Sequence, residues 1–435
     1  MIISSKELVR IEGHGKLIIE IENGKVKDVK FRVLEPPRLF EAFLIGRNIE
    51  EVPYISSKIC GLCGYSHALC SVKALEKALK IEVPIEVKVL REIIEMMSVI
   101  SSHIIHIFAL SLPDFINVNN FSELLAKNGE IIKEAFSLKQ EIDYLLRKVC
   151  GDSIHPINLI PGGFSSKITM EKLNELRGKI EKWIFKASSL ANKVYPLLKV
   201  DEEFRRSGLY ASLISKEYTF YIGDMISINN EKIEVSNFKS KVNEKFSSDS
   251  TSKKAFIHGK NFMVGALARL NLNNDKLSSR AKEMLRELKL KLPSLNPKLI
   301  PLAQLIEIIH CLEKILEYLN ELKSVKYIRE VDLTTIKEVK KKNYGVGMAI
   351  IEAPRGILYH EYEIRDWKII RTDIITPTVQ NIPDIESSVK TILSQYEIND
   401  LNKVKKHAET IVRCYDPCLS CSTHVVIVSQ RHKVN

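Results

Sequence analysis

Long hydrophobic runs, secretion signals and dense cysteines are all missing from this sequence. No uninterrupted apolar run reaches the ~18 residues that a membrane-spanning helix needs, and residues 1–10 lack the apolar core of a signal peptide. Eight cysteines in 435 residues are too few for a disulfide scaffold, and 18 glycines with 15 prolines exclude collagen-like and low-complexity classes. These absences, together with a 45% share of hydrophobic residues, predict a cytoplasmic globular protein with a substantial buried core.

An excess of acidic residues is also missing, because 65 Lys and Arg against 54 Asp and Glu give a formal net charge of +11. Such a chain binds nucleic acid or an anionic membrane when its basic residues cluster. Here they alternate with glutamate along stretches such as residues 276–291. We therefore expect an ion-paired, solvated surface without a nucleic-acid partner; a protein partner with an acidic face is the alternative.

The hydrophobic pattern predicts an α+β fold that is predominantly helical. Two β-rich stretches, residues 16–22 and 25–35, flank Asn23-Gly24, a pair typical of two-residue hairpin turns. Apolar residues from Leu90 to Phe108 recur at spacings of three and four, which predicts a long buried helix. Further helical patterns cover residues 140–148, 170–198, 277–289, 302–322 and about 383–412. We expect a central helical bundle with small peripheral β elements.

One domain is expected over residues 1–435. Its parts are an N-terminal β element (1–40), a helical core (41–330), a strand and loop segment (331–382), a C-terminal helix with a metal motif (383–424) and an extension (425–435). Within the core, residues 228–254 are rich in Ser, Lys and Asn with weak periodicity, and they predict a surface insertion.

The cysteines are the most informative residues, because four of them form two Cys-x-x-Cys pairs at opposite ends of the chain. The pairs are Cys60 with Cys63 and Cys418 with Cys421, followed closely by His67 and His424. The pairs lie 418 − 63 = 355 residues apart, whereas zinc ribbons close loops of about 15–20 residues. Four soft thiolates favour a buried transition-metal site, with a long-range structural zinc site or unrelated thiols as alternatives.

Several other short motifs occur in order around these pairs. They are Arg10-Ile-Glu-Gly-His14, Glu35-Pro-Pro-Arg-Leu-Phe-Glu41, Gly46-Arg47, Ser102-His-Ile-Ile-His106, Pro113-Asp114, His155-Pro156, Pro161-Gly-Gly163, Glu352-Ala-Pro-Arg-Gly356, Pro377-Thr-Val-Gln-Asn381 and the closing segment from Asp416 to His424. Together with the cysteines, they make nearly the whole chain resemble the large, catalytic subunit of nickel–iron hydrogenases, in particular the shorter cytosolic and archaeal type.

The resemblance implies a nickel–iron centre that converts dihydrogen reversibly to protons and electrons. Cys60 and Cys418 would be terminal nickel ligands, and Cys63 and Cys421 would bridge nickel to an iron that carries cyanide (CN) and carbonyl (CO) ligands. No further cysteine set suits an iron–sulfur cluster, so the electrons would leave through an obligate partner, the iron–sulfur small subunit.

The resemblance also assigns roles to residues around the metals. Cys418 would accept the proton and Glu12 would relay it, since a carboxylate held away from water exchanges protons near neutrality. Arg355 would overhang the open metal position, held there by Asp114 and Asp416. The remaining implied contacts are Thr378 to a cyanide, Pro377 packed beside it, and His67 to a bridging thiolate.

A second metal and a processing step are implied at the C-terminus. Glu41, His424 and a backbone carbonyl near Ile374 would bind a structural magnesium or iron. Residues 425–435 would be removed by a maturation endopeptidase after nickel-insertion proteins have loaded the site. Two positions depart from the family pattern without removing a ligand: Lys58 replaces the usual arginine, and Cys414 the more frequent serine.

Three other functions compete with catalysis. A hydrogen-sensing regulatory hydrogenase has the same site, a relative of the quinone-site subunit of respiratory complex I shares the fold without the cysteines, and a zinc-stabilised structural protein needs only the thiolates. The other cysteines, Cys70, Cys150, Cys311 and Cys414, are expected to be small buried side chains.

Overall fold

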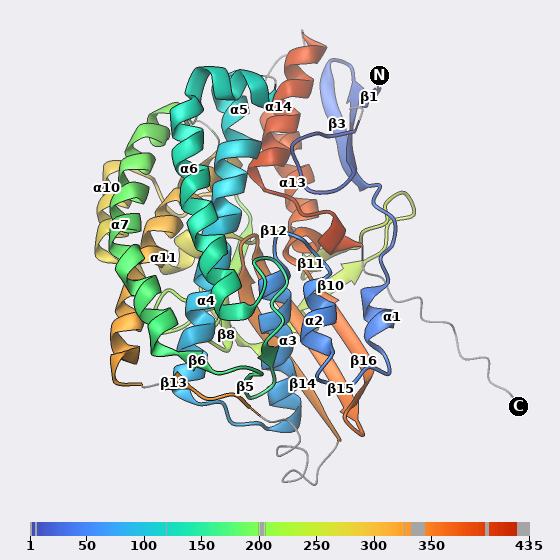
Figure 1. Ribbon diagram of the computed structural model, residues 1–435. Coiled ribbons are helices and arrows are strands. Elements are labelled where there is room, and N and C mark those ends of the chain that lie inside the picture. The colour runs from blue at the N-terminus through green and yellow to red at the C-terminus, as the bar shows by residue number, and fades with distance from the viewer. Residues whose placement is uncertain are drawn as a thin grey trace, which may run out of the picture.

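The computed structural model describes residues 2–4, 7–118, 120–198, 200, 204, 206–325, 327–331, 344–395 and 400–423. Long helices stand side by side on one side of the molecule, and a sheet formed by the late strands β14, β15 and β16 lies on the other (Figure 1). Helix α3 packs between them, against both α4 and the sheet. The predicted α+β, mostly helical fold is confirmed.

The helices are α1 (Phe40–Leu44), α2 (Val52–Ser57), α3 (Gly64–Leu79), α4 (Ile85–Ile105), α5 (Leu112–Phe115), α6 (Phe121–Cys150), α7 (Met170–Val194), α8 (Phe238–Lys241), α9 (Ala266–Asn273), α10 (Ser279–Glu287), α11 (Ile300–Glu321), α13 (Pro377–Leu393) and α14 (Leu401–Cys414). The strands are β1 (Ile2–Ser4), β2 (Gly15–Glu22), β3 (Lys25–Val33), β4 (Leu159–Ile160), β5 (Gly163–Phe164), β6 (Ile168–Thr169), β7 (Leu209–Ile214), β8 (Met225–Ile228), β9 (Glu231–Glu234), β10 (Val242–Lys245), β11 (Lys254–Ile257), β12 (Phe262–Met263), β13 (Tyr327–Ile328), β14 (Tyr344–Ala353), β15 (Gly356–Arg365) and β16 (Lys368–Ile375).

The N-terminal hairpin forms as predicted. Strands β2 and β3 pair antiparallel around Asn23 and Gly24, whose φ angles of 50° and 72° are the positive values that such a tight turn requires. Alternate residues of β2, beginning with Gly15 and Leu17, are buried against the core. Because one face of β2 packs on the core, the segment just before Gly15 is held against the rest of the protein.

The predicted long helix is α4, which continues through a π-helical turn, His106–Ser111. Every member of its predicted apolar stripe is buried, and α4 packs against α6 and α11. Within the described part of the chain, one stretch, Ile85–Phe115, is long and apolar enough to cross a membrane, but 78% of its apolar window is buried in the protein. This stretch is the central core helix.

Helix α3 lies unusually close to β14, because two glycines remove the side chains between them. A Cβ atom on Gly345 would lie 1.9 Å from the carbonyl oxygen of Ala78, and one on Gly347 would lie 2.2 Å from that of Ala74. Lys73 of α3 adds hydrogen bonds from its Nζ to three backbone carbonyls, including Ile350 O at 3.0 Å. The second half of α3 is thereby fixed relative to the sheet.

One sequence expectation about the middle of the chain holds in part, and one about its end is wrong. Residues 228–254 lie largely at the surface, as predicted, but they form β9, α8 and β10, and Phe238 and Val242 are buried in a second apolar cluster with Tyr359 of β15. The single helix expected over 383–412 is two helices, because α13 begins at Pro377 and α14 begins at Leu401. Proline fits the first helical turn, where no N–H bond is needed, but Pro377 and not Pro383 occupies that position.

Glu95 of α4 is a buried carboxyl group whose titration destabilises the fold as the pH rises. The Ser66 hydroxyl donates to Oε1 at 2.6 Å, and among the described residues Oε2 has no partner. Burial raises the pKa of Glu95 to about 8, against the lowering effect of Ser66; Glu92 and Glu352 raise it further, and Arg269 lowers it. The folded protein therefore binds a proton that the unfolded chain releases above its usual carboxyl pKa.

We expect Glu95→Gln to flatten the pH dependence of stability between about pH 5 and 8. Stability that depends on the Glu95 proton is present at low pH and is lost as pH rises, at about 1.4 kcal/mol per pH unit for one proton. Denaturant unfolding at several pH values measures this slope. Parallel curves for the wild type and Glu95→Gln would contradict the assignment, and Glu130→Gln, on a solvated face of α6, is the control.

Candidate metal centre

The two cysteine pairs meet in the interior, although they come from opposite ends of the chain. The four Sγ atoms of Cys60, Cys63, Cys418 and Cys421 all lie within 4.8 Å of one another, and all four side chains are buried. Cys60 and Cys418 are 3.1 Å apart, Cys63 and Cys421 3.2 Å, and Cys418 and Cys421 2.8 Å. All four are free cysteines, so the arrangement is a cluster of four thiol donors.

The first pair is placed by the beginning of α3. Cys63 directly precedes the helix as its N-cap residue. Gly64 must be glycine, because a Cβ there would lie 2.6 Å from Ile154 O and 2.9 Å from Ser57 O. Arg38 also donates to the carbonyl oxygens of Lys58 and Ile59 at 3.2 and 2.5 Å, which fixes the chain just before Cys60.

The second pair lies in the turn after α14 and is held from two sides. The Cys418 amide donates to Thr378 Oγ1 at 3.0 Å, and the Leu419 amide donates to the Glu12 carbonyl at 3.0 Å. Asp416 has a positive φ of 52°, which reverses the chain before the pair. The N-terminal segment and the start of α13 thus set the position of the last cysteines.

Among the four thiols, the pKa of Cys60 alone is lowered, chiefly by hydrogen bonds from the other three sulfurs and also by the nearby charge of Arg355. Burial raises the pKa of Cys418 and of Cys421 well above the usual thiol value. A bound soft metal cation reverses this effect and is the partner that four buried sulfurs suit best. The donor set therefore fits a thiolate-bound transition metal.

Arg355 supplies the fixed positive charge beside the sulfurs. Its Nε donates to Asp416 O at 2.6 Å and its Nη2 to Asp416 Oδ1 at 2.9 Å. Burial lowers the pKa of Arg355, but Asp416 and the neighbouring Cys418, Cys63 and Cys60 outweigh it, so the net pKa is raised and the charge is kept. Its buried Nη1 has no partner among the described residues, which leaves the two N–H groups of this nitrogen for a ligand at the sulfurs.

The expectation that Asp114 also holds Arg355 is wrong. Asp114 Oδ1 instead accepts from Arg10 Nη2 at 2.5 Å, and its two oxygens accept from Arg413 at 2.6 and 3.1 Å. Arg413 also donates to the Val9 carbonyl, so Asp114 ties the N-terminal segment to the end of α14. The physical reason is that two other arginines, Arg10 and Arg413, already surround Asp114, while Asp416 holds Arg355 along its Nε–Nη2 edge.

We expect Asp114→Asn to cost stability rather than to disturb Arg355. Both Asp114 and Arg413 have only 3% of their side chain exposed, and breaking one side of a buried ion pair costs about 3–5 kcal/mol. Denaturant unfolding measures the loss. The matched control is Asp249→Asn, because Asp249 pairs with Arg32 at a partly exposed position, where about 1 kcal/mol or less is expected. Equal losses in the two variants would overturn the assignment.

Glu12 lies where a proton relay to Cys418 is predicted. Its carboxylate accepts from the Ser420 hydroxyl at 2.5 Å and from the Ser420 amide at 3.0 Å, and Ser420 Oγ lies 4.0 Å from Cys418 Sγ. Glu12 is half-buried, whereas Ser420 is 6% exposed. A chain of exchangeable groups thus runs from the thiolate through Ser420 to a carboxylate near the surface.

The remaining predicted residues of the site lie around the sulfurs. Pro377 and Thr378 form the first turn of α13, and both are buried. The His67 ring contacts His360, with Nδ1 3.1 Å from Nε2, and His360 Nδ1 lies 2.7 Å from the Tyr362 hydroxyl. The predicted contact of His67 with a bridging thiolate stays a prediction.

The predicted second metal site is described only in part, because His424 lies outside the described residues. Glu41 is buried, and the Ile374 amide donates to its Oε1 at 2.8 Å, so these two predicted neighbours are brought together. The Thr423 carbonyl accepts from the amide of Arg38, three residues before Glu41, at 3.0 Å, so the chain just before His424 runs beside the segment that carries Glu41. Metal binding here stays a prediction.

Sequence reasoning missed Ser420, Arg38, His360 and Arg413. Ser420 lies inside the second cysteine pair, which is the one local signal that pointed to it. Arg38 likewise lies inside the motif from Glu35 to Glu41, whereas His360 and Arg413 act through contacts between distant segments, which no local pattern reveals. The expectation for the other cysteines is confirmed: all four are buried, and burial raises the pKa of Cys70, Cys150 and Cys414 to about 12.

Comparisons with known proteins agree with this geometry. A family model described as nickel-dependent hydrogenase matches residues 38–151 and 211–424, which include all four clustered cysteines. The alpha subunit of sulfhydrogenase 2 from Pyrococcus furiosus is 33% identical over 427 residues, covering 98% of this chain and 100% of the relative. One subunit of the vhc F420-non-reducing hydrogenase from Methanococcus voltae is 30% identical over 458 residues, covering 98% and 95%.

Solved structures share the fold. An NAD+-reducing [NiFe]-hydrogenase in its H2-reduced state superposes with a TM-score of 0.85 at 24% identity, covering 98% of this chain and 99% of that one. A Ni-Fe-Se hydrogenase from Desulfovibrio vulgaris Hildenborough gives a TM-score of 0.75 at 24% identity, covering 98% and 100%. The whole described architecture, and not only the cysteine motifs, is therefore shared.

Proposed function

The chain belongs to the nickel-dependent hydrogenase family, and we propose that its four clustered thiolates hold a nickel–iron centre whose iron carries cyanide and carbonyl ligands. The chain is the catalytic component of a hydrogenase, an oxidoreductase that interconverts dihydrogen with protons and electrons. The observation that carries the proposal is the meeting of two distant cysteine pairs beside a buried arginine. The intact cysteine set argues against a complex I-like relative, which lacks it.

When bound, the nickel–iron pair supplies adjacent electron-rich metals at which the bond of dihydrogen is polarised and split. Cys60 and Cys418 suit the terminal nickel positions and Cys63 and Cys421 the bridging ones.

The Cys418 sulfur accepts the proton, the Ser420 hydroxyl passes it on, and the Glu12 carboxylate exchanges it with water. Arg355 keeps its cation beside the reacting position and donates from Nη1. Thr378 Oγ1, which accepts from Cys418, keeps its own hydrogen for a cyanide.

The electrons leave through a partner protein. Each relative is named as one subunit of a larger hydrogenase, and this chain retains no cysteine set for a cluster beyond the metal site. We infer that an iron–sulfur subunit covers the hollow of about 160 Å³ lined by Gly61, Leu62 and Ile154, because the loop between Cys60 and Cys63 forms its wall. Ile154, 46% exposed, offers apolar surface at its rim.

Maturation and the second metal complete the proposal. Glu41, His424 and the Ile374 carbonyl bind a structural magnesium or iron, which the Glu41–Ile374 contact supports. Residues 425–435, outside the described part, are removed by an endopeptidase after nickel insertion in the cytoplasm. The intact mass of the active, metal-loaded chain tests this step, and a mass that still includes these residues would contradict it.

Metal analysis of the natively purified complex, combined with dihydrogen-dependent dye reduction, tests the proposed function. We expect one nickel per chain and dye reduction only under dihydrogen. Zinc in place of nickel, without dihydrogen oxidation, would contradict the proposal and favour a structural zinc site instead.

A further inference from the structure

Arg355 projects from a tight turn whose backbone is held by an unusual number of polar contacts. Strands β14 and β15 pair up to Ala353 and Gly356, so Pro354 and Arg355 alone form the turn. Gly356 has a φ of 129°, and a Cβ on Gly265 would lie 2.8 Å from the Arg355 carbonyl oxygen. The backbone before α9 thus packs directly against the turn, and little room is left for it to move.

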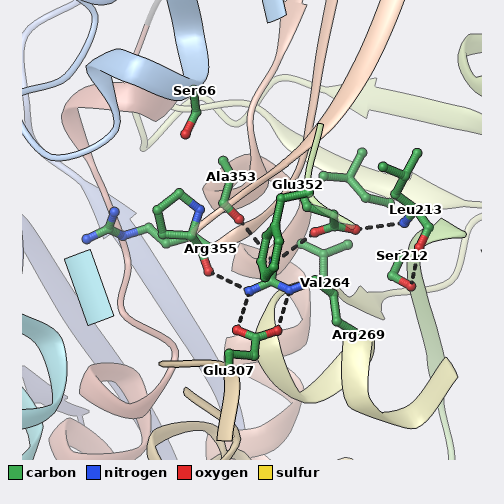
Figure 2. A network of polar contacts seen from close by, with 12 residues as sticks. Ser66, Ser212, Leu213, Val264, Arg269, Glu307, Glu352, Ala353 and Arg355 are labelled. Carbon is green, nitrogen blue, oxygen red and sulfur yellow. Dashed lines mark hydrogen bonds and ion pairs between the residues drawn. The ribbon is translucent and has the colours of Figure 1, made fainter. Parts of the chain in front are cut away.

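A second buried arginine, Arg269 of α9, holds the other two carbonyls of this turn. Its Nη1 donates to Ala353 O at 3.0 Å, and its Nη2 donates to Pro354 O at 3.1 Å. Figure 2 shows the Arg269 guanidinium between Glu307 below and the turn above, with the Arg355 side chain leaving in the opposite direction. Arg269 therefore grips the backbone that carries Arg355 without occupying the Arg355 side chain.

Two carboxylates fix Arg269 in turn. Glu307 of α11 accepts from Nε at 2.6 Å and from Nη2 at 2.8 Å, and Glu352 of β14 accepts from Nη1 at 2.8 Å. With the two carbonyls, all five N–H donors of the guanidinium are used, and 1% of the side chain is exposed. Burial alone raises the pKa of Glu307, but Arg269 and His103 bring it down to about 2. Glu307 is therefore ionised near neutral pH, and its ion pair with Arg269 is kept.

We propose that Arg269 is a positioning residue for the dihydrogen reaction: by holding the carbonyl oxygens of Ala353 and Pro354, it keeps Arg355 aimed at the four sulfurs. The inference rests on the proposed nickel–iron function and adds a residue that makes no contact with the reacting atoms. A rigid fork with five donors is needed, because a lysine has three donors on a flexible stem and cannot hold both carboxylates and both carbonyls.

Arg91 provides a matched control for this proposal. It is also fully buried, it also pairs with a carboxylate, Glu76, at 2.8 and 3.0 Å, and it also holds two carbonyls, those of Ile160 and Gly163. Its carbonyls belong to the β4–β5 turn and not to the turn that carries Arg355. A purely structural role for Arg269 predicts that the two arginines respond alike to substitution.

The test compares Arg269→Lys and Arg91→Lys in the intact, natively purified complex. We expect Arg269→Lys to retain nickel and iron, to lower kcat by about tenfold to a hundredfold, since misplacement by about 1 Å costs up to that much, and to shift the infrared bands of the cyanide ligands near Arg355. Arg91→Lys should lower thermal stability while leaving the bands in place. Metal-loaded Arg269→Lys with wild-type bands and kcat would overturn the proposal.

A second variant keeps the test decisive if Arg269→Lys does not fold. Glu352→Gln preserves the shape of the side chain and weakens its hold on Arg269, so we expect a smaller band shift in the same direction and a smaller loss of kcat. Unchanged bands and kcat in metal-loaded Glu352→Gln would then overturn the proposal. A wild-type complex without cyanide and carbonyl bands would instead contradict the proposed function itself, so the two failures are distinguishable.

Discussion

Cys418→Ser abolishes dihydrogen turnover and lowers the nickel content of the purified complex to background: this is the largest effect that the site predicts. Cys418 lies 3.1 Å from Cys60 and 2.8 Å from Cys421, so its sulfur belongs to both halves of the cluster. A serine hydroxyl is a hard donor that stays protonated near neutrality, and it replaces neither the soft ligand nor the proton acceptor. Elemental analysis and dye reduction under dihydrogen measure the two losses.

Cys414→Ser is the control for this experiment. Cys414 is also buried, four residues earlier, and burial raises the pKa of its thiol to about 12, but it lies outside the four-sulfur cluster. We expect this variant to keep its nickel and its turnover. A Cys418→Ser complex that still holds nickel in wild-type amounts, or a Cys414→Ser complex that loses it, would contradict the ligand assignment.

Glu12→Gln separates proton transfer from metal binding, and we expect it to lower turnover by at least about a hundredfold with the metals intact. General acid–base groups contribute about 10²–10⁴ in rate. The amide oxygen of glutamine can still accept from the Ser420 amide, which Glu12 binds at 3.0 Å, so the loop around Cys418 keeps its shape. The lost function is exchange of the proton that Ser420 hands over.

Dye reduction and hydrogen–deuterium exchange measure the effect of Glu12→Gln, and nickel content and infrared spectra check the metals. The matched control is Glu35→Gln, because Glu35 accepts from the His14 amide at 3.0 Å, close to Glu12 in the same region, and is not part of the relay to Cys418. Full turnover in Glu12→Gln, or equal losses in both variants, would exclude Glu12 as the relay.

Local sequence patterns predicted those parts of the protein that local physics determines. Asn23-Gly24 predicted the hairpin because few other residues adopt positive φ, and the apolar stripe of α4 predicted a core helix because one face must be buried. The two cysteine pairs predicted a joint site because soft donors at such spacing have few other uses. The first two signals lie within one hairpin and one helix, and the third consists of two short motifs from opposite ends of the chain.

What the sequence could not predict depends on contacts between distant segments. Asp114 was assigned to Arg355, yet it pairs with Arg10 and Arg413, because the choice among buried arginines depends on packing and not on spacing. Arg269 gave no signal at all, since its partners come from α11 and from the end of β14. The apolar residues of 228–254 were too weakly periodic to reveal the cluster that they complete with β15.

Infrared spectroscopy of the natively purified complex, in the window where metal-bound carbonyl and cyanide absorb and protein groups are nearly silent, tests the central claim most directly. Four thiolates from the two ends of one chain, holding nickel and iron beside Arg355, predict one carbonyl and two cyanide bands that shift under dihydrogen. The bands should be absent from Cys418→Ser and present in Cys414→Ser. A silent window in mature, metal-loaded wild-type protein would contradict the claim.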